Sequence, residues 1–298
     1  MTATPLRTAV VIGCGTTGTS VALALTGAGI DVALIDDDPR ATAEAVALGA
    51  GTPWTPGRPP ADLVVVATPP SAVVDTLYSA QSRGLGEVYT DTAGTKDVVA
   101  DDAELRGCDL KGYVPGHPLA GPDASGRAAA DAGRFTGRPW VLCPYETTPG
   151  WALETVSALI ELCGAQRLDL TPEVHDRLVA ELSHAPHVVA AALSSRFSDS
   201  SSAFLGLAEA ALGDAVRTAG GDPWLWGDVL AHNAGPVADV LDRIAGQLAR
   251  ASAILREGDA SAPLELALTL EEGRRGQTAL RRAGGPGTTR DARAGGRV

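Results

Sequence analysis

The chain has few cysteines and few aromatic residues. Its four cysteines are scattered without the spacing of metal ligands or of a disulfide framework. We therefore expect reduced thiols, a cytoplasmic protein and no metal site. Aromatic residues make up 4% of the sequence, so leucine, valine and alanine must fill the core. No apolar run reaches the about 18 residues of a membrane span, and the N-terminus does not resemble a signal peptide.

Positive charge is also scarce, since the net charge is −12. This acidity argues against nucleic acid as a partner. Arginines are concentrated in residues 274–298, and the segment 284–298 is predicted to be a disordered tail. A body this acidic needs local cations wherever it binds an anionic small molecule.

The first half of the chain alternates β-rich runs with helical patterns. Strands are predicted at 7–13, 31–36, 61–69, 86–94, 110–116, 138–144 and 166–170, and helices at 19–29, 40–50, 71–84 and 151–165. This alternation predicts an α/β fold, a doubly wound and mainly parallel sheet with helices on both faces.

The strand pattern stops at Thr171. Thr171 followed by Pro172 is typical of the start of a helix. The sequence beyond has helical periodicity to about residue 282. We predict a sheet domain over 1–171 and an all-α domain over 172–283, ahead of the tail.

A glycine-rich turn follows the first predicted strand. Gly13, Gly15 and Gly18 have the G-x-G-x-x-G spacing, between a strand and a helix. Gly13 allows the tight turn, Gly15 lets the backbone approach a pyrophosphate, and Gly18 lets helix and strand pack closely. With Thr16 and Thr17 at the helix start, the turn predicts dinucleotide binding by a Rossmann-type domain.

The ends of the next two strands extend this site. Asp36 lies where a carboxylate accepts hydrogen bonds from ribose hydroxyls, and the acidic run that it opens favours NAD over NADP. Arg40 could pair with a 2′-phosphate, although solvation at a helix start is its more ordinary role. Thr68 and Pro69 end the third strand at the carboxyl edge of the sheet, where ligands bind in such folds.

His117 lies between glycines and prolines in "VPGHPLAG", on a predicted loop after a strand. A lone loop histidine is usually solvated. Here the flanking residues restrict its backbone, and its place after a sheet strand brings it near the nicotinamide end of a dinucleotide. Because histidine accepts protons near neutral pH, His117 is the candidate acceptor for the proton of an oxidised hydroxyl.

"SHAPH" places His184 and His187 three residues apart, on one face of a helix. Either can be an ordinary core histidine or a substrate contact. A metal site that includes His175 is not expected, because no Cys or carboxylate cluster completes it. Pro186 is expected to kink the helix and to turn His187 toward a cleft.

Arg217 lies in "DAVR", three residues after Asp214. A lone arginine on a helix is usually a surface charge. This one lies in an otherwise nearly uncharged, glycine-flanked stretch, so it is the candidate cation for a substrate carboxylate.

With these motifs in view, the chain resembles the prephenate/arogenate dehydrogenase family of tyrosine biosynthesis. The glycine-rich turn, "DTAGTK", "GHPLAG", "SHAPH", "DAVR" and "DPWLWGDVLAHN" occur in the family's order and spacing, over about residues 7–275. The resemblance implies a Rossmann domain, a helical domain for substrate binding and dimerisation, and hence a homodimer. It also implies NAD(P)-dependent oxidative decarboxylation of a cyclohexadienol.

The resemblance assigns roles to five residues. His117 matches the catalytic histidine, which takes the proton of the ring hydroxyl. His187 matches a substrate-binding histidine, and Arg217 matches the arginine that grips the substrate carboxylate. Asp214 matches a residue that orients this arginine, and Asp123 lies where an acidic residue is linked to substrate choice.

The chain departs from the family's pattern at two positions. Gly94 stands where a serine usually holds the substrate hydroxyl and the catalytic histidine, and the adjacent Thr95 is a candidate substitute. Val216 replaces the threonine that commonly precedes the arginine. The family's frequent C-terminal regulatory domain is not expected.

Three alternatives accompany this interpretation. The substrate can be prephenate or arogenate, or else 4-amino-4-deoxyprephenate of a specialised pathway, which would fit Gly94. A β-hydroxyacid dehydrogenase shares the two-domain plan but uses a lysine of its helical domain, and here the last lysine is Lys111. A regulatory protein that senses NAD is the non-enzymatic alternative, and it would need neither His117 nor Arg217.

Overall fold

The structure is a computed structural model, and it describes residues 6–119, 129–206, 210–258 and 260–282. The chain divides into two compact units, residues 1–240 and residues 241–298. The predicted tail 284–298 lies outside the described residues.

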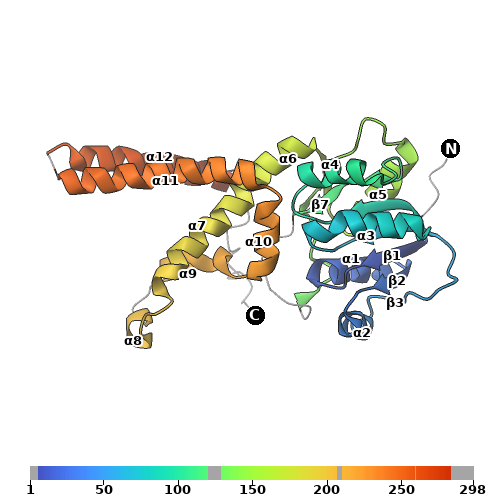
Figure 1. The fold of residues 1–298 in the computed structure, drawn as a ribbon. Coiled ribbons are helices and arrows are strands. Elements are labelled where there is room, and N and C mark those ends of the chain that lie inside the picture. The colour runs from blue at the N-terminus through green and yellow to red at the C-terminus, as the bar shows by residue number, and fades with distance from the viewer. Residues whose placement is uncertain (1–5, 120–128, 207–209, 259, 283–298) are drawn as a thin grey trace, which may run out of the picture. The chain divides into compact units, whose positions relative to one another are not determined.

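A six-stranded parallel sheet forms the centre of the first unit (Figure 1), with the strand order β3-β2-β1-β4-β5-β6. Its strands are β1 (Thr8–Ile12), β2 (Asp31–Ile35), β3 (Thr52–Pro53), β4 (Ala61–Val66), β5 (Gly86–Asp91) and β6 (Tyr113–Val114). The strand order reverses between β1 and β4, and in such sheets ligands bind beyond the carboxyl ends of the strands at this point. The predicted doubly wound α/β fold is confirmed.

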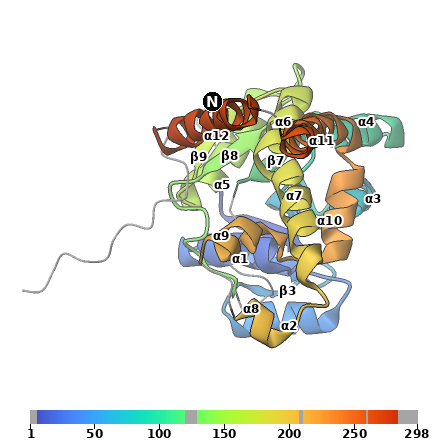
Figure 2. The ribbon, with the colours of Figure 1, turned by 90° about the vertical axis from the view of Figure 1, so that its left-hand side faces the viewer.

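Helices cover both faces of this sheet. They are α1 (Thr16–Gly27), α2 (Pro39–Ala47), α3 (Pro70–Ser82), α4 (Asp97–Arg106) and α5 (Gly150–Leu162). Successive side chains of a strand point to opposite faces. Accordingly, Ala9 and Val11 of β1 join one buried cluster with residues of α1 and α5. Val10 and Ile12 join the other cluster with residues of α3 and α4, and Figure 2 shows these two helices together on the right.

A second, three-stranded sheet holds β7 (Gly116–Pro118), β8 (Pro139–Leu142) and β9 (Gln166–Asp169), with β7 antiparallel to β8. The prediction of a loop at His117 was therefore wrong, because His117 pairs with Val141 in this sheet. Gly116 makes the arrangement possible: a Cβ added there would come within 3.0 Å of the carbonyl oxygen of Asp91.

Two helices also differ from expectation. α4 was not predicted, because acidic residues interrupt the apolar spacing of its sequence "DVVADDAELR". α3 begins at Pro70, one residue before the predicted start. The backbone N–H and the hydroxyl of Ser71 donate to Asp228 Oδ2 at 3.0 and 2.9 Å.

The remainder of the first unit is helical, with α6 (Pro172–Val179), α7 (Ala185–Ser194), α8 (Ser202–Leu205), α9 (Ala210–Val216) and α10 (Pro223–Ala231). Thr171 caps α6, as predicted, and its Oγ1 accepts the N–H of Val174. Pro186 lies in the first turn of α7. The five residues before α7 form a π-helical turn, in which the N–H of Ala185 reaches the carbonyl of Ala180.

The second unit contains the greater part of α11 (Ala234–Glu257) and the whole of α12 (Ala262–Arg282). Large apolar side chains are exposed on both helices, at Leu248, Leu255, Leu264, Leu268, Leu270 and Leu280. None of the described helices combines the length and the apolar character that crossing a membrane requires.

Candidate active site

The glycine-rich turn lies at the carboxyl edge of the six-stranded sheet. Gly13 has φ +101°, and a Cβ there would collide with the carbonyl oxygen of Ala67. A Cβ at Gly18 would collide with the carbonyl oxygen of Gly13, so strand and helix pack closely only without a side chain. A Cβ at Gly15, by contrast, would meet no atom within 4 Å. The space in front of Gly15 is therefore open.

Helix α1 begins beside this space at Thr16, and no side chain caps it. Its positive end is thus presented where an anion can approach. Asp36 lies at the end of β2, and its carboxylate accepts the N–H of Cys14 at 2.6 Å and that of Asp38 at 2.8 Å. The acidic side chain is therefore held against the turn, as a ribose-binding carboxylate requires.

The other predicted nucleotide contacts have mixed surroundings. Thr17 is half-buried in the first turn of α1, and Arg40 is exposed in the first turn of α2. Thr68 follows β4, and its hydroxyl is buried without a hydrogen-bond partner among the described residues. Pro69 is exposed and precedes α3.

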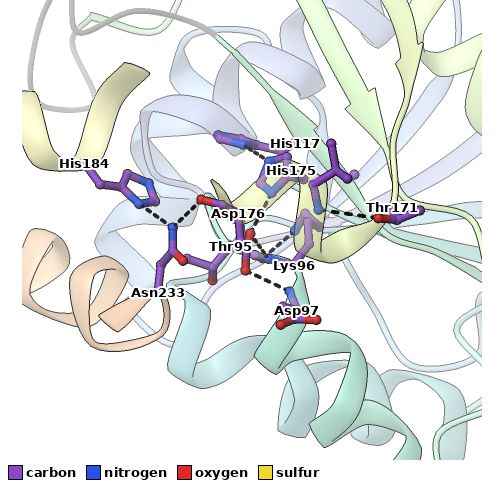
Figure 3. A network of polar contacts seen from close by, with 12 residues as sticks. Thr95, Lys96, Asp97, His117, Thr171, His175, Asp176, His184 and Asn233 are labelled. Atoms are coloured by element: carbon purple, nitrogen blue, oxygen red, sulfur yellow. Dashed lines mark hydrogen bonds and ion pairs between the residues drawn. The ribbon is translucent and has the colours of Figure 1, made fainter. Parts of the chain in front are cut away.

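His117 is half-buried, and its ring meets two different environments. Its Nδ1 lies 2.9 Å from Nε2 of His175, whose own Nδ1 lies 2.7 Å from Oδ1 of Asp176 (Figure 3). A Cβ added at Gly94 would lie 3.8 Å from both Cε1 and Nε2 of His117. The Nε2 edge of His117 therefore faces the space beside Gly94, and the Nδ1 edge faces a chain of polar residues.

These polar residues are hydrogen-bonded to the start of α4. Oδ1 of Asp176 accepts the N–H of Lys96, and Oδ2 accepts the N–H of Asp97, each at 2.9 Å. Asn233 donates to the carbonyl oxygen of Asp176 at 2.8 Å and lies 3.0 Å from Nδ1 of His184. Figure 3 shows these contacts between α6, the start of α4, His184 and Asn233.

Three residues of this network were not predicted from the sequence as site residues: His175, Asp176 and Asn233. His175 was considered only as a metal ligand. The sequence feature that could have indicated them is the adjacent pair His175 and Asp176 in a predicted helix. In the structure both side chains are buried on α6. Among the described residues, no group of three or more His, Cys, Asp or Glu side chains is placed to hold a metal ion.

A buried ion pair lies next to the histidines. Nζ of Lys96 lies 2.6 Å from Oδ1 of Asp91 and 2.9 Å from the carbonyl oxygen of Thr95, and both charged side chains are 0% exposed. Asp91 also accepts the hydroxyl of Tyr113 at 2.7 Å and the N–H of Ala93 at 2.8 Å. The pair therefore places a compensated positive charge beneath the site.

Burial dominates the protonation of the histidines. It holds the pKa of His117 well below the ordinary value of 6.5, and repulsion from His175, Lys96 and His184 acts in the same direction. Burial also lowers the pKa of His175, although its hydrogen bond to Asp176 opposes the shift. The pKa of His184 falls to about 4, again mainly through burial. These rings are therefore neutral near pH 7.

Helix α10 brings aromatic and apolar groups to the site. The ring of Trp226 stacks on His187 at a centroid distance of 3.7 Å and an interplanar angle of 11°. Nδ1 of His187 is buried without a hydrogen-bond partner among the described residues. A Cβ at Gly94 would lie 3.7 Å from Val229 Cγ1. Val229 therefore borders the space that Nε2 of His117 faces.

The other predicted substrate residues lie in different settings. Arg217 is exposed and begins a 3₁₀ turn that packs against α7, the helix of His187. Asp214 is exposed, and among the described residues it forms no ion pair with Arg217. Thr95 is 0% exposed, and its hydroxyl has no partner in the described part of the chain. Asp123 lies outside the described residues.

A glycine-rich turn at the carboxyl edge of a parallel sheet is typical of a nucleotide-binding protein, and here helices follow the sheet in the sequence. Comparison with known proteins narrows this class. Residues 21–168 match the family described as prephenate dehydrogenase, nucleotide-binding domain, and residues 171–272 match prephenate dehydrogenase, dimerization domain.

Similar proteins carry related names. The chain is 39% identical over 260 residues to the probable prephenate dehydrogenase NovF of Streptomyces niveus, covering 86% of this chain and 72% of that protein. It is 29% identical over 264 residues to prephenate dehydrogenase of Bacillus subtilis (strain 168), covering 85% and 71%. The chain therefore belongs to the prephenate dehydrogenase family, which is a family of oxidoreductases.

A solved structure shows the same fold. Prephenate dehydrogenase from Aquifex aeolicus, in complex with hydroxyphenyl propionate and NAD⁺, matches with a TM-score of 0.79 and 24% sequence identity. The match covers 93% of this chain and 99% of that one.

Proposed function

We propose that this protein catalyses the NAD-dependent oxidative decarboxylation of prephenate or arogenate, with His117 as the proton acceptor. The observation that carries the proposal is the direction of the His117 ring. Its Nε2 faces the space bordered by Gly94 and Val229, while its Nδ1 is held by another histidine. The two relatives described above, both called prephenate dehydrogenases, support this chemistry.

The residues of the glycine-rich turn fit a dinucleotide. The open space at Gly15 and the uncapped start of α1 suit a pyrophosphate, and Asp36 suits a ribose diol. We assign NAD rather than NADP because Asp36, Asp37 and Asp38 would repel a 2′-phosphate. When bound, the nicotinamide supplies the hydride acceptor.

The chain's own residues then handle the proton and the carboxylates. Nε2 of His117 takes the proton of the ring hydroxyl as that carbon is oxidised. Loss of the ring carboxylate as CO₂ leaves an aromatic product, so the reaction runs strongly forward. Arg217 holds the carboxylate that is retained, and His187 holds a second polar group. We propose substrate-binding roles also for three residues that the motifs indicate: Asp214, Asp123 and His184.

A second candidate substrate is 4-amino-4-deoxyprephenate, and Gly94 favours it. A substrate hydroxyl that donates to His117 still has lone pairs to accept a hydrogen bond, which a serine at this position would donate. A protonated amine has only donors, so the absence of a serine leaves no acceptor of the substrate unsatisfied. Thr95 remains the proposed substitute for a hydroxyl substrate: its hydroxyl has no partner in the described part of the chain, and because it is 0% exposed it must be uncovered to reach a substrate.

The deciding experiment measures NADH formation with prephenate, arogenate and 4-amino-4-deoxyprephenate in parallel, for the wild type and for Gly94→Ser. A Cβ at Gly94 makes only ordinary contacts, the nearest at 3.7 Å, so this variant should fold normally. Turnover of prephenate or arogenate by the wild type is the expected result.

Turnover of the amino compound alone would transfer the protein to the second candidate, and Gly94→Ser should then raise the rate with prephenate. If none of the three compounds is turned over while NAD still binds, the NAD-sensing alternative would replace both proposals.

Arg217→Ala is expected to raise the KM for the substrate and to leave kcat within about tenfold, since the arginine contacts a carboxylate that does not react. Initial rates across a range of substrate concentrations test this. Arg196→Ala is a matched control, because Arg196 is also an arginine of the helical region in a short 3₁₀ turn. An unchanged KM in Arg217→Ala would remove Arg217 from the substrate site.

We also propose that the protein is a homodimer, formed through its helical domain. Leu264 and Leu268 lie one turn apart on α12 and are 65% and 60% exposed, and Leu248 and Leu255 on α11 are similarly exposed. A monomer rarely leaves so much apolar surface in water, and these residues lie within the match to the family's dimerization domain.

Leu264→Glu/Leu268→Glu is therefore expected to yield a monomer, because burying two carboxylates in an interface is costly. Light scattering after size-exclusion chromatography measures the mass. Leu105→Glu is the control, since Leu105 is 84% exposed on α4 and lies far outside the dimerization match. A wild-type protein with the mass of one chain would contradict the proposal.

A further inference from the structure

Among the described residues, the ring of His117 has one hydrogen-bond partner, His175. His175 Nε2 lies 2.9 Å from its Nδ1, and Gly94 offers no hydroxyl on the opposite edge of the ring. His175 is itself 1% exposed and lies in contact with Asp176. The arrangement thus places a buried histidine and a buried aspartate behind the half-buried histidine that faces the substrate space.

The hydrogen-bond partners of Asp176 determine which atom donates in the bond between Asp176 and His175 and in the bond between His175 and His117. Its two carboxylate oxygens accept backbone N–H groups of Lys96 and Asp97. An ionised carboxylate only accepts, so Nδ1 of His175 must carry the hydrogen that it shares with Asp176. A neutral His175 then has a lone pair on Nε2, and that lone pair can only accept from Nδ1 of His117. His117 is left with its lone pair on Nε2.

We propose that His175 is a positioning residue for the reaction, which Asp176 orients so that His175 holds His117 in the tautomer whose Nε2 accepts the substrate proton. When Nε2 takes that proton, the Nδ1–H of His117 stays bonded to His175, and the carboxylate of Asp176 balances the new positive charge through His175. No other proton needs to move. The inference rests on the proposed role of His117.

A purely structural role is the alternative, since Asp176 also ties α6 to the start of α4. Two amide variants separate the roles, because each reproduces one nitrogen of the ring. The amide of Gln reaches the position of Nε2 and can accept from His117, but it loses the contact with Asp176. The amide of Asn reaches the position of Nδ1 and keeps the contact with Asp176, but it offers His117 no acceptor.

The test compares kcat and KM of the dimeric wild-type protein, His175→Gln and His175→Asn with the substrate that the wild type turns over. We expect His175→Gln to keep kcat within about tenfold and His175→Asn to lose about 10²-fold, with similar KM values for all three. Equal losses, or a smaller loss in His175→Asn, would overturn the proposal and leave His175 with a structural role.

A second measurement does not depend on turnover. Because the chain has only five histidines, ¹⁵N NMR of histidine-labelled protein without substrate can assign the tautomer of each ring. We expect His117 to carry its hydrogen on Nδ1 in the wild type and in His175→Gln, and to lose this preference in His175→Asn. Hydrogen on Nε2 of His117 in the wild type would overturn the inference, even if the protein proves to be an active dehydrogenase. The expected tautomer in a protein that turns over none of the substrates would support the orientation of His117 by His175 and contradict the proposed function, and with it the role of His175 in that reaction.

Discussion

Replacing His117 with asparagine is expected to lower kcat by about 10²–10⁴-fold while NAD still binds. Asparagine keeps a side-chain group that can form hydrogen bonds, but it cannot take up a proton near neutral pH. The glycine-rich turn and Asp36 follow β1 and β2, whereas His117 lies in β7. The rate is measured by NADH formation, and the affinity for NAD by calorimetric titration.

His232→Asn is the matched control for this variant. His232 follows α10, and its Nδ1 hydrogen bond is to the carbonyl oxygen of Asp228. The control should retain kcat within a few-fold. Full activity of His117→Asn would remove His117 from the proton transfer, and loss of NAD binding in that variant would show a disturbed fold rather than a missing base.

The pH dependence gives an independent check on the same histidine. Because burial, together with the nearby His175, Lys96 and His184, lowers the pKa of His117, the ring stays neutral as the pH falls through 6.5. The acid limb of kcat/KM should therefore lie below pH 6.5, and the activity should be lost only as the pH falls through the lowered pKa. A profile of kcat/KM from pH 4.5 to pH 8, in buffers of constant ionic strength, locates this limb. An acid limb at or above pH 6.5 would contradict the lowered pKa.

Asp91→Asn is expected to reduce the free energy of unfolding by about 3–5 kcal/mol, the usual cost of leaving a buried charge without its partner. The ammonium group of Lys96 is 0% exposed, and in this variant its acceptors, the carbonyl oxygen of Thr95 and the new side-chain amide oxygen, would both be neutral. Urea unfolding, followed by circular dichroism, measures the change.

Two further variants make this result specific. Asp75→Asn removes one partner of the exposed Asp75–Arg106 pair, whose side chains are 77% and 51% exposed, and should cost less than about 1 kcal/mol. Asp91→Asn/Lys96→Met removes both charges and should recover part of the loss. A cost for Asp91→Asn no larger than that for Asp75→Asn would show that the buried pair does not stabilise the fold as argued.

Short-range patterns in the sequence were sufficient for the architecture. The alternation of strands and helices, the glycine spacing at Gly13, Gly15 and Gly18, and the cap at Thr171 each depend on residues a few positions apart. Backbone sterics and local hydrogen bonds act over such distances, so the parallel sheet, the glycine-rich turn and the start of α6 could be predicted. Strand β7 could not be, because the Pro and Gly residues around His117 are typical of a loop and its pairing partner Val141 is distant.

The sequence by itself determined which groups this protein has for chemistry: an acidic body, a glycine-rich turn, His117 and an arginine in a nearly uncharged stretch. Only the tertiary structure decided which nitrogen of His117 faces the space beside Gly94. The contact between His117 and His175 joins residues 58 positions apart, and that between Asp97 and Asp176 joins residues 79 apart. Such bonds form only after α6 packs against the start of α4, and no local pattern encodes that approach.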